Sequence, residues 1–236
     1  MIELRLVLQL IIAHLLSDFI LQPQNWSDRK KEGLLTSIHI YHVVVVGSLS
    51  YVLSLDFGFW KAAILLTILH LLTDILKSWL IRRNRAKDYF FLDQLIHLAS
   101  IIGVVILYSA YSGIDFILYV ELKTIAIITG FIFCLKHSNI LIKYVMKAFS
   151  IEIPQNNDEH PEETGLPNAG KLIGIVERFL TLALIMMGQY EAVGLIIAAK
   201  SILRFSGTQK NEYVLVGTLL SFGIAIFLGI FIGFLK

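Results

Sequence analysis

Apolar runs of roughly 18 residues or more recur along most of this chain, and they restrict what it can fold into. Each run is long enough, as a helix, to cross a hydrocarbon layer of about 30 Å. Hydrophobic residues make up 56% of the 236 residues and charged residues only 16%, whereas soluble domains carry roughly 25% charged residues. The sequence therefore predicts an all-α, polytopic transmembrane helix bundle.

About eight spans are expected from these runs. Their approximate bounds are 3–21, 37–55, 60–80, 90–110, 117–147, 170–187, 189–205 and 212–235. The fifth is long enough to tilt or to extend into water, and the link 188–190 is short enough to require a tight hairpin or a re-entrant turn. The acidic, Pro- and Asn-containing segment 150–169 is expected to be a mobile cytoplasmic loop. It separates a five-span module, 1–149, from a three-span module, 170–236.

The positions of the basic residues predict the orientation. Twelve of the 20 Lys and Arg residues lie in or beside the links that follow odd-numbered spans. Four lie near the span ends on the other side of the membrane. This bias places the loops 22–36, 81–89, 148–169 and 206–211 in the cytoplasm and both termini outside. The net charge of +2 gives no reason to expect nucleic acid. The single cysteine, Cys134, allows neither an intrachain disulfide nor a cysteine-based zinc site.

Two nearly identical phrases occur in the first and third spans. HLLSDFILQ begins at His14 and HLLTDILKS begins at His70, so each carries a histidine and an aspartate four residues apart. A further histidine follows each phrase at the start of the next span, His39 after 25 residues and His97 after 27. This pattern predicts that the first four spans form two parallel-repeat helical hairpins related by a pseudo-twofold axis along the membrane normal.

The ionisable residues of these four spans are expected to converge at one depth. Some lie late in odd spans and the others early in even spans, and these ends share one side of an up-down bundle. The charge bias makes that side cytoplasmic. The eight residues are His14, Asp18, His39, His42, His70, Asp74, Asp93 and His97.

Imidazole and carboxylate together suit a divalent transition metal, with Zn first and Mn or Fe as alternatives. Asp93 is the candidate general base, and His42 is expected to orient a ligand or to shuttle protons. The expected ligands are His14, Asp18, His39, His70, Asp74 and His97. The alternative is a purely structural hydrogen-bonded network between helices, with Lys77 either paired with Asp74 or extended toward the interface.

The second module places further charges at the same level. Arg178 opens the sixth span, and Lys200 and Arg204 lie four residues apart near the end of the seventh. Together they are expected to hold an anionic lipid head group. The alternative is that they only anchor the helices by the positive-inside rule, with Glu177 and Arg178 acting as capping residues.

Several of these segments resemble a bacterial membrane family catalogued as domain of unknown function 3307. The matching pieces are HLLSDFILQ, IHIYH, HLLTDILK, FLDQLIH, GKLIGIVERFL, AAKSILRF and EYVLVGTLLSF. The resemblance covers essentially the whole chain and implies a multi-pass protein of the bacterial cytoplasmic membrane, but it implies no activity. The histidine- and aspartate-rich spans are also similar, more loosely, to bacterial integral membrane proteins described as metal-dependent hydrolases.

The leading functional prediction is a metal-dependent intramembrane hydrolase that opens to the cytoplasmic leaflet. Its substrate is expected to be a membrane lipid or a lipid-linked molecule, with or without a phosphate. The main alternative is a transporter for metal ions or protons that uses the same ligands. A third possibility is a membrane scaffold or sensor without catalysis. Oligomeric state is not predicted.

Overall fold

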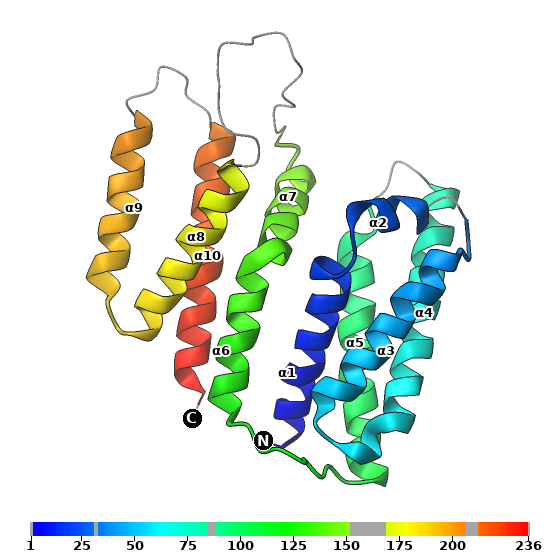
Figure 1. Cartoon of the computed structure of the whole chain (residues 1–236). Coiled ribbons are helices and arrows are strands. Elements are labelled where there is room, and N and C mark those ends of the chain that lie inside the picture. The colour runs from blue at the N-terminus through cyan, green and yellow to red at the C-terminus, as the bar shows by residue number, and fades with distance from the viewer. Residues whose placement is uncertain (1, 31–32, 85–87, 152–168, 206–211, 236) are drawn as a thin grey trace. The chain divides into compact units, whose positions relative to one another are not determined.

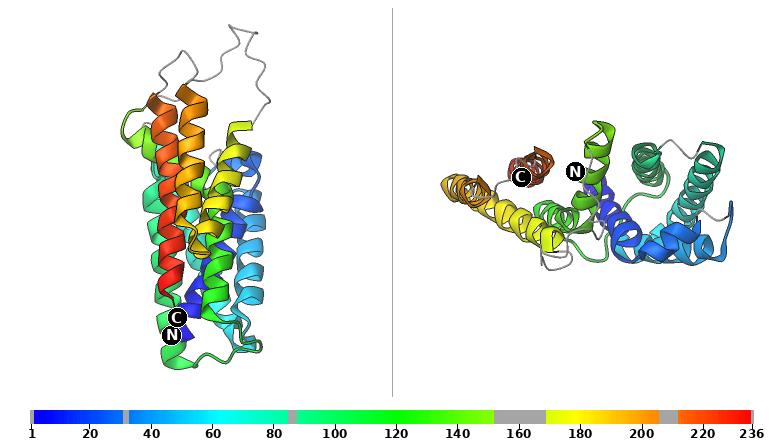
Figure 2. Two further views of the ribbon diagram at one scale, coloured as in Figure 1. Left: turned by 90° about the vertical axis from the view of Figure 1, so that its left-hand side faces the viewer. Right: turned by 90° about the horizontal axis from the view of Figure 1, so that it is seen from above.

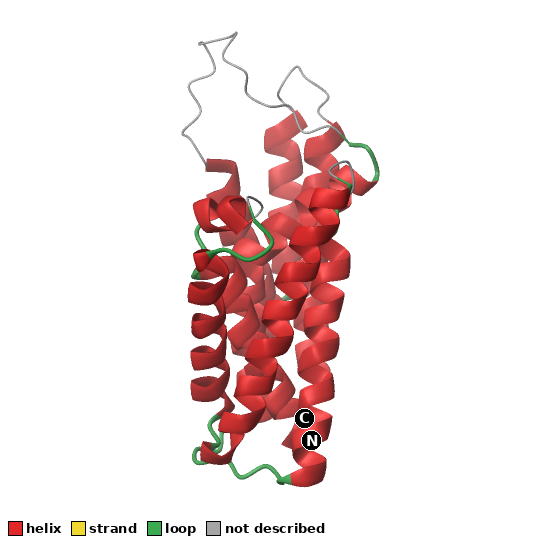
Figure 3. Cartoon of the chain, turned by 90° about the vertical axis from the view of Figure 1, so that its right-hand side faces the viewer, coloured by secondary structure: helices red, strands yellow, loops and turns green. Residues whose placement is uncertain are grey.

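The computed structural model describes residues 2–30, 33–84, 88–151, 169–205 and 212–235. These residues form helices and connecting segments without strands, which confirms the all-α prediction (Figure 3). The chain divides into two compact units, residues 1–129 (unit 1) and 130–236 (unit 2). The boundary lies inside a helix and precedes segment 150–169, most of which is outside the described residues.

Unit 1 is a four-helix bundle. Helix α1 packs against α3 and α5, and α4 packs against the same two helices, so the contacts close a ring (Figures 1 and 2). The bounds are α1 Ile2–Leu15, α2 Gln24–Lys30, α3 Ser37–Ser54, α4 Trp60–Arg83 and α5 Phe90–Tyr111. One half of the bundle is filled by a core of Leu6, Leu10, Phe59, Ala62, Ala63, Leu66, Ile101, Val104, Val105 and Tyr108.

A glycine allows α3 and α4 to approach closely. A Cβ atom built on Gly47 would lie 2.4 Å from the Oγ1 atom of Thr67, closer than any real side chain tolerates. Gly47 follows His42 by five residues on α3, and Thr67 precedes His70 by three residues on α4. The contact therefore sets the spacing of the two helices next to these histidines.

The apolar end of unit 1 is closed by Asp56. Its carboxylate accepts hydrogen bonds from the Gly58 amide (2.8 Å), the Tyr108 hydroxyl (2.8 Å) and the Asp115 amide (3.1 Å). These bonds join the α3–α4 connection to α5 and to the segment that follows it. Asp56 is 3% exposed, and its hydrogen bonds satisfy both carboxylate oxygens.

Five helices in the described part of the chain are long and apolar enough to cross a membrane. They are Ser37–Ser54, Phe57–Arg83, Phe90–Tyr111, Leu122–Ala148 and Tyr213–Phe234. A sixth span results if Glu3–Ile20 and Gln24–Lys30, which meet at 88°, are counted as one broken span. The number eight stays a prediction, since α9 has only 16 residues, fewer than the roughly 17–25 of a typical span.

Two predicted segments differ from the structure. The fifth span begins at Leu122 and not at 117, because residues 113–121 are not helical. The expected loop 22–36 contains α2, a short polar helix that starts after Pro23 and has no apolar periodicity to reveal it. Proline suits this position because a helix start needs no amide donor there.

Unit 2 contains the rest of the long fifth segment and three further helices. α6 (Leu122–Ile132) continues through a π-helical turn, Phe133–His137, into α7 (Ser138–Ala148). α10 (Glu212–Phe234) packs against α7 and α8 (Ala169–Met186), and α8 packs against α9 (Tyr190–Phe205). The tight α8–α9 hairpin is confirmed: Gly188 has a φ of +72° and its amide donates to the Ile185 carbonyl.

Candidate functional site

Helix α1 ends in a π-helical turn that carries the first aspartate. The turn spans Leu16–Ile20, and the Leu21 amide donates to the Leu16 carbonyl five residues back. The buried Ser17 hydroxyl donates to Oδ1 of Asp18 at 2.9 Å. Single π-helical turns inside α-helices are frequent at functional sites, and this one holds Asp18 at the interior of the bundle.

Three imidazoles converge on one carboxylate oxygen of Asp18. Oδ1 lies 3.5 Å from Nδ1 of His14, 3.4 Å from Nε2 of His42 and 3.5 Å from Nε2 of His70. The two Nε2 atoms of His42 and His70 are 2.9 Å apart. The histidines come from α1, α3 and α4, so three helices meet at this point.

The distances fit a tetrahedral metal site. With metal–ligand bonds of about 2.0–2.1 Å, neighbouring ligand atoms of a tetrahedral zinc site lie about 3.3–3.5 Å apart. Two edges of the Asp18–His42–His70 triangle have these lengths, and the third is shorter by about half an ångström, which small rotations of the rings would correct. Three protein ligands leave one coordination position open, as catalytic zinc sites do.

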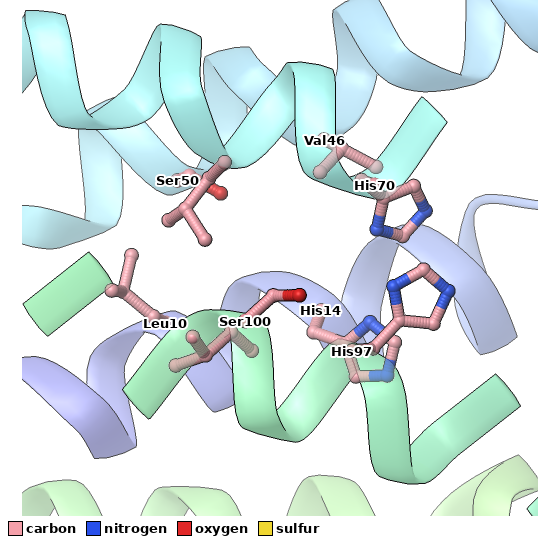
Figure 4. A pocket seen from close by; sticks show the side chains of 9 residues that line it. Leu10, His14, Val46, Ser50, His70, His97 and Ser100 are labelled. Atoms are coloured by element: carbon pink, nitrogen blue, oxygen red, sulfur yellow. The ribbon is translucent and has the colours of Figure 1, made fainter. Parts of the chain in front are cut away.

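A small cavity lies beside this triangle. Its volume is about 20 Å³, enough for one water molecule. The rings of His70 and His97 stack with centroids 4.0 Å apart, and His14 lies against His97 at 5.0 Å. The cavity is lined by these three rings together with Leu10, Val46, Ser50, Leu66, Ser100 and Ile101 (Figure 4).

The second aspartate of the repeated phrases has a different partner. Nζ of Lys30, from α2, lies 2.6 Å from Oδ2 of Asp74, and Lys30 is only 8% exposed. Lys30 lies in the predicted cytoplasmic loop 22–36 and is one of the twelve basic residues that indicated the orientation. Nothing in the pattern around it indicates that α2 bends back and inserts this lysine into the bundle.

Asp93 forms a second ion pair. Its Oδ2 is 2.7 Å from Nζ of Lys77, and its Oδ1 is 3.5 Å from Nε2 of His97. The expected pairing of Lys77 with Asp74 is therefore wrong, because Lys77 reaches across to α5 and Lys30 neutralises Asp74. Gln94 donates to Asp93 at 3.1 Å and its Oε1 lies 3.2 Å from Nε2 of His14.

His39 does not join the other histidines. Its Nδ1 accepts a hydrogen bond from the Thr36 amide at 3.1 Å and caps the start of α3, while its Nε2 faces Ser78 at 3.4 Å. His42, three residues later, takes the place expected for His39. The groups of side chains that come within 4.8 Å of one another are His14–His70–His97, Asp18–His42–His70 and Asp74–Asp93–His97.

Arg178, expected to bind a head group, is fully buried in unit 2. Its guanidinium donates to the Cys134 carbonyl (3.0 Å), Ser221 (2.9 Å) and Asn139 (2.7 Å). The Cys134 carbonyl belongs to the π-helical turn of the α6–α7 segment, where the backbone of Leu135 departs from helical geometry. Arg178 therefore binds backbone and side-chain oxygens at a break in a helix, which leaves few donors for a ligand.

Lys200 forms an ion pair with Glu177, and its ammonium group lies 5.4 Å from the centre of the Phe222 ring. The side chain of Arg204, the third residue expected to bind a head group, lies outside the described residues. In the described part of unit 2, therefore, neither Arg178 nor Lys200 presents an unpaired cation to a ligand.

Comparison with known proteins gives one match. The model of a family described as protein of unknown function (DUF3307) matches residues 6–124, just over half of the chain and nearly all of unit 1. No curated protein matches, and no solved structure matches. The looser similarity to metal-dependent hydrolases stays a prediction.

Proposed function

The chain belongs to the DUF3307 family of proteins of unknown function, and we propose that it is a membrane-embedded, metal-dependent hydrolase. One observation carries this proposal: Asp18, His42 and His70 present three donor atoms at the spacing of a tetrahedral metal site with an open position. Zinc suits the donor set best, and Mn or Fe are the alternatives. His14 is the fourth potential ligand.

The bound metal would polarise the scissile oxygen and lower the pKa of a water molecule to about 7. His97 is the proposed base, because it lines the cavity and Asp93 faces its Nε2 atom. The other ring nitrogen, Nδ1, would accept a proton from the water as its oxygen attacks the substrate. That proton would then pass to the leaving oxygen, so that one water is consumed for each bond cleaved. Asp93 acts through His97 in this proposal.

The apolar core of unit 1 supports an enzyme with access from one side. Beyond the cavity, the buried core cluster of the four helices is aliphatic or aromatic as far as Tyr108, which binds Asp56, and α1 adds the buried polar residues Gln9 and Arg5. The ionisable groups gather instead toward the end covered by α2. We propose that this end faces the cytoplasm, in agreement with the basic-residue bias.

The same proposal includes three further points. The chain lies in a bacterial inner membrane, it has eight spans, and its first four spans form two related hairpins. The two His-x-x-x-Asp phrases lie at one level on α1 and α4, which supports the repeat. His42 and His97 are better counterparts than His39 and His97. They follow their phrases by 28 and 27 residues, and both are almost fully buried.

One observation favours a transporter as the second candidate. Trp60 and Trp79 are both exposed on α4, and 19 residues of helix separate them by about 28 Å, close to the thickness of the hydrocarbon layer. His70 lies about halfway between them, and cation sites of transporters lie near the midplane. Transport would require the apolar core to open.

The test is metal analysis and hydrolysis with the purified full-length protein in nanodiscs. We expect one zinc ion per chain and metal-dependent cleavage of p-nitrophenyl butyrate or bis(p-nitrophenyl) phosphate. Metal and activity should be lost in His42→Ala and kept in His39→Gln, the matched control. Stable, folded protein that binds no added zinc would overturn the metal site. Zinc uptake into sealed vesicles without hydrolysis would favour the transporter.

A further inference from the structure

The charged groups around Asp18 do not cancel. Among the described residues of the cluster there are three carboxylates, Asp18, Asp74 and Asp93, and two ammonium groups. Lys30 neutralises Asp74 and Lys77 neutralises Asp93. Asp18 faces only histidines and the Ser17 hydroxyl. With neutral imidazoles, which is the form that binds a metal, the cluster has a net charge of −1.

The two lysines limit the site to one metal ion. Asp74, Asp93 and His97 come close enough together to form a second metal group. Both carboxylates, however, already bind an ammonium group at 2.6–2.7 Å. A second divalent ion would have to displace both lysines within a largely buried cluster, where an unpaired ammonium is costly. The remaining group, His14–His70–His97, shares His70 with Asp18–His42–His70, so the two groups do not bind separate ions. One divalent metal ion therefore adds two positive charges.

One divalent ion converts the cluster from −1 to +1. A buried net charge is unfavourable in a low-dielectric interior, so the loaded site favours a ligand with a single negative charge. Hydroxide meets this condition in the resting enzyme. If a neutral ester displaced the hydroxide, the net charge of the cluster and its ligand would be +1. With a dianionic phosphomonoester it would be −1.

A groove beside Lys77 indicates where such a ligand would come from. Thr73, Lys77, Tyr89 and Asp93 are its residues with polar side-chain atoms, and it lies between α4 and α5. Its walls carry the apolar side chains of Leu76, Leu80, Leu92 and Ile96, of which Leu76 and Leu92 are exposed. Lys77 is 35% exposed, so a charged group at this depth is reachable from the outer surface of the bundle. In a membrane, that surface contacts lipid.

We propose that the loaded site takes a singly charged phosphodiester, supplied by the phosphate linkage of a membrane phospholipid. The net charge selects the monoanion, the open metal position binds one of its non-bridging oxygens, and the exposed side chains of Leu76 and Leu92 beside the groove contact the adjoining chain. This inference rests on the proposed function, since without a metal ion the cluster carries the opposite charge.

The test uses the full-length protein in dodecyl maltoside, with Co²⁺ in place of zinc, because the visible spectrum of Co²⁺ reports its coordination without any turnover. Three probes of similar shape and different charge are titrated: dimethyl phosphate (−1), trimethyl phosphate (neutral) and methyl phosphate (−2). We expect dimethyl phosphate to bind at least about tenfold more tightly than the other two. Equal affinities, or tightest binding of methyl phosphate, would overturn the inference while leaving the metal site intact.

Charge variants test the cause. Lys77→Met lowers the loaded charge to zero and should abolish the preference for dimethyl phosphate. Lys77→Met combined with Asp93→Asn restores +1 and should restore it, and this pair also avoids a buried, unpaired carboxylate. Lys61→Met, an exposed lysine at the other end of α4, is the control and should change nothing. If the preference for dimethyl phosphate did not change with the net charge of the cluster in these variants, the proposal would be contradicted.

A separate experiment tests whether the phosphodiester comes from a membrane lipid. In nanodiscs of phosphatidylglycerol, the Co²⁺ spectrum should already be that of the dimethyl phosphate complex, whereas in phosphate-free detergent it should be that of the water complex. Identical water-type spectra in both would rule out the lipid and assign the site to a soluble phosphodiester. Absence of any protein-bound Co²⁺ spectrum would overturn the proposed function itself, together with this inference.

Discussion

HLLSD at residues 14–18 and HLLTD at residues 70–74 differ by one hydroxyl-bearing residue, yet they form different structures. The first ends in a π-helical turn, and His14 faces Asp18 through its Nδ1 atom. The second continues as a regular α-helix to Arg83, and His70 faces Asp74 through its Nε2 atom at 3.9 Å. The same spacing thus presents different ring nitrogens to the two aspartates.

The partners of the two aspartates differ even more than the helices. Asp74 is neutralised by a lysine of the same chain, whereas Asp18 meets three histidines and no ammonium group within the described residues. A four-residue spacing puts a histidine and an aspartate on one helix face. It does not determine which group from another helix completes the site. The aspartate of the second phrase is neutralised by a lysine, and that of the first phrase is not.

The largest expected difference between the two copies is in metal affinity. Asp18→Asn should weaken zinc binding by more than about 100-fold, beyond the 10–100-fold typical of groups that only orient ligands. Asp74→Asn should fall within that range, because Asp74 is 3.9 Å from both His42 and His70. Competition with a fluorescent zinc chelator measures both. Equal losses would mean that the two copies contribute equivalent ligands.

Lys30→Met tests the second phrase, in which Lys30 neutralises the carboxylate of Asp74. Removing one partner of a buried ion pair costs about 3–5 kcal/mol, so this variant should lower the free energy of unfolding by that order. Combining it with Asp74→Asn should recover a large part of the loss, since no buried charge then lacks its partner. Chemical denaturation in detergent followed by circular dichroism measures this effect. Additive losses in the double variant would show that the pair is not coupled.

Gly47→Ala changes the distance between the helices that carry His42 and His70. The added methyl group overlaps the Thr67 hydroxyl, and overpacking of this kind costs typically about 1–3 kcal/mol. Thermal unfolding should show the loss, and zinc affinity should fall with it. Adding Thr67→Ala removes the overlapping oxygen and should restore both quantities. If it restores neither, the helix spacing is set elsewhere.

Gln94→Ala should have the smallest effect and should act on the first copy only. The hydrogen-bond partners of Gln94 are His14 and Asp93, which leaves the second phrase, His70 to Asp74, without a direct bond to it. Loss of a group that orients a ligand typically weakens metal binding about 10-fold or more, and stability should hardly change. The same chelator assay checks this, with Gln24→Ala as the exposed control. A larger effect than that of Asp18→Asn would reverse the proposed roles.

Much of the site follows from the sequence. Whether a span has an odd or an even number determines on which side of the membrane it ends, and hence the depth of the residues near that end. Histidines and aspartates at the ends of odd spans and the starts of even spans had to lie at one level, and His14, Asp18, His70, Asp74 and His97 do so. The choice between His39 and His42 was not accessible. They lie three residues apart, both are buried, and only the rotation of α3 decides which one faces the other histidines.

Other features depended on contacts between distant segments. Lys30 reaches Asp74 only because α2 turns by 88° after the π-helical turn. Pro23 marks the break, but no local signal in the sequence gives the direction that α2 takes. Lys77 is placed correctly for Asp74 by its three-residue spacing, but α5 brings Asp93 closer. The role of Arg178 could not be predicted because it depends on the break in the facing helix at Leu135.

The apolar core next to the cavity also bears on membrane energetics. A line of histidines and carboxylates inside a membrane is a potential path for protons, because such side chains form proton relays. Between Ser50 and Ser100 at the cavity and the opposite end of unit 1, however, the buried core cluster consists of aliphatic and aromatic side chains without an imidazole or carboxylate, and its one hydroxyl, that of Tyr108, is held by Asp56. Aliphatic constrictions of this kind exclude water. In a membrane, the histidines and carboxylates at one end of the bundle would therefore not continue through the buried core cluster to the other end.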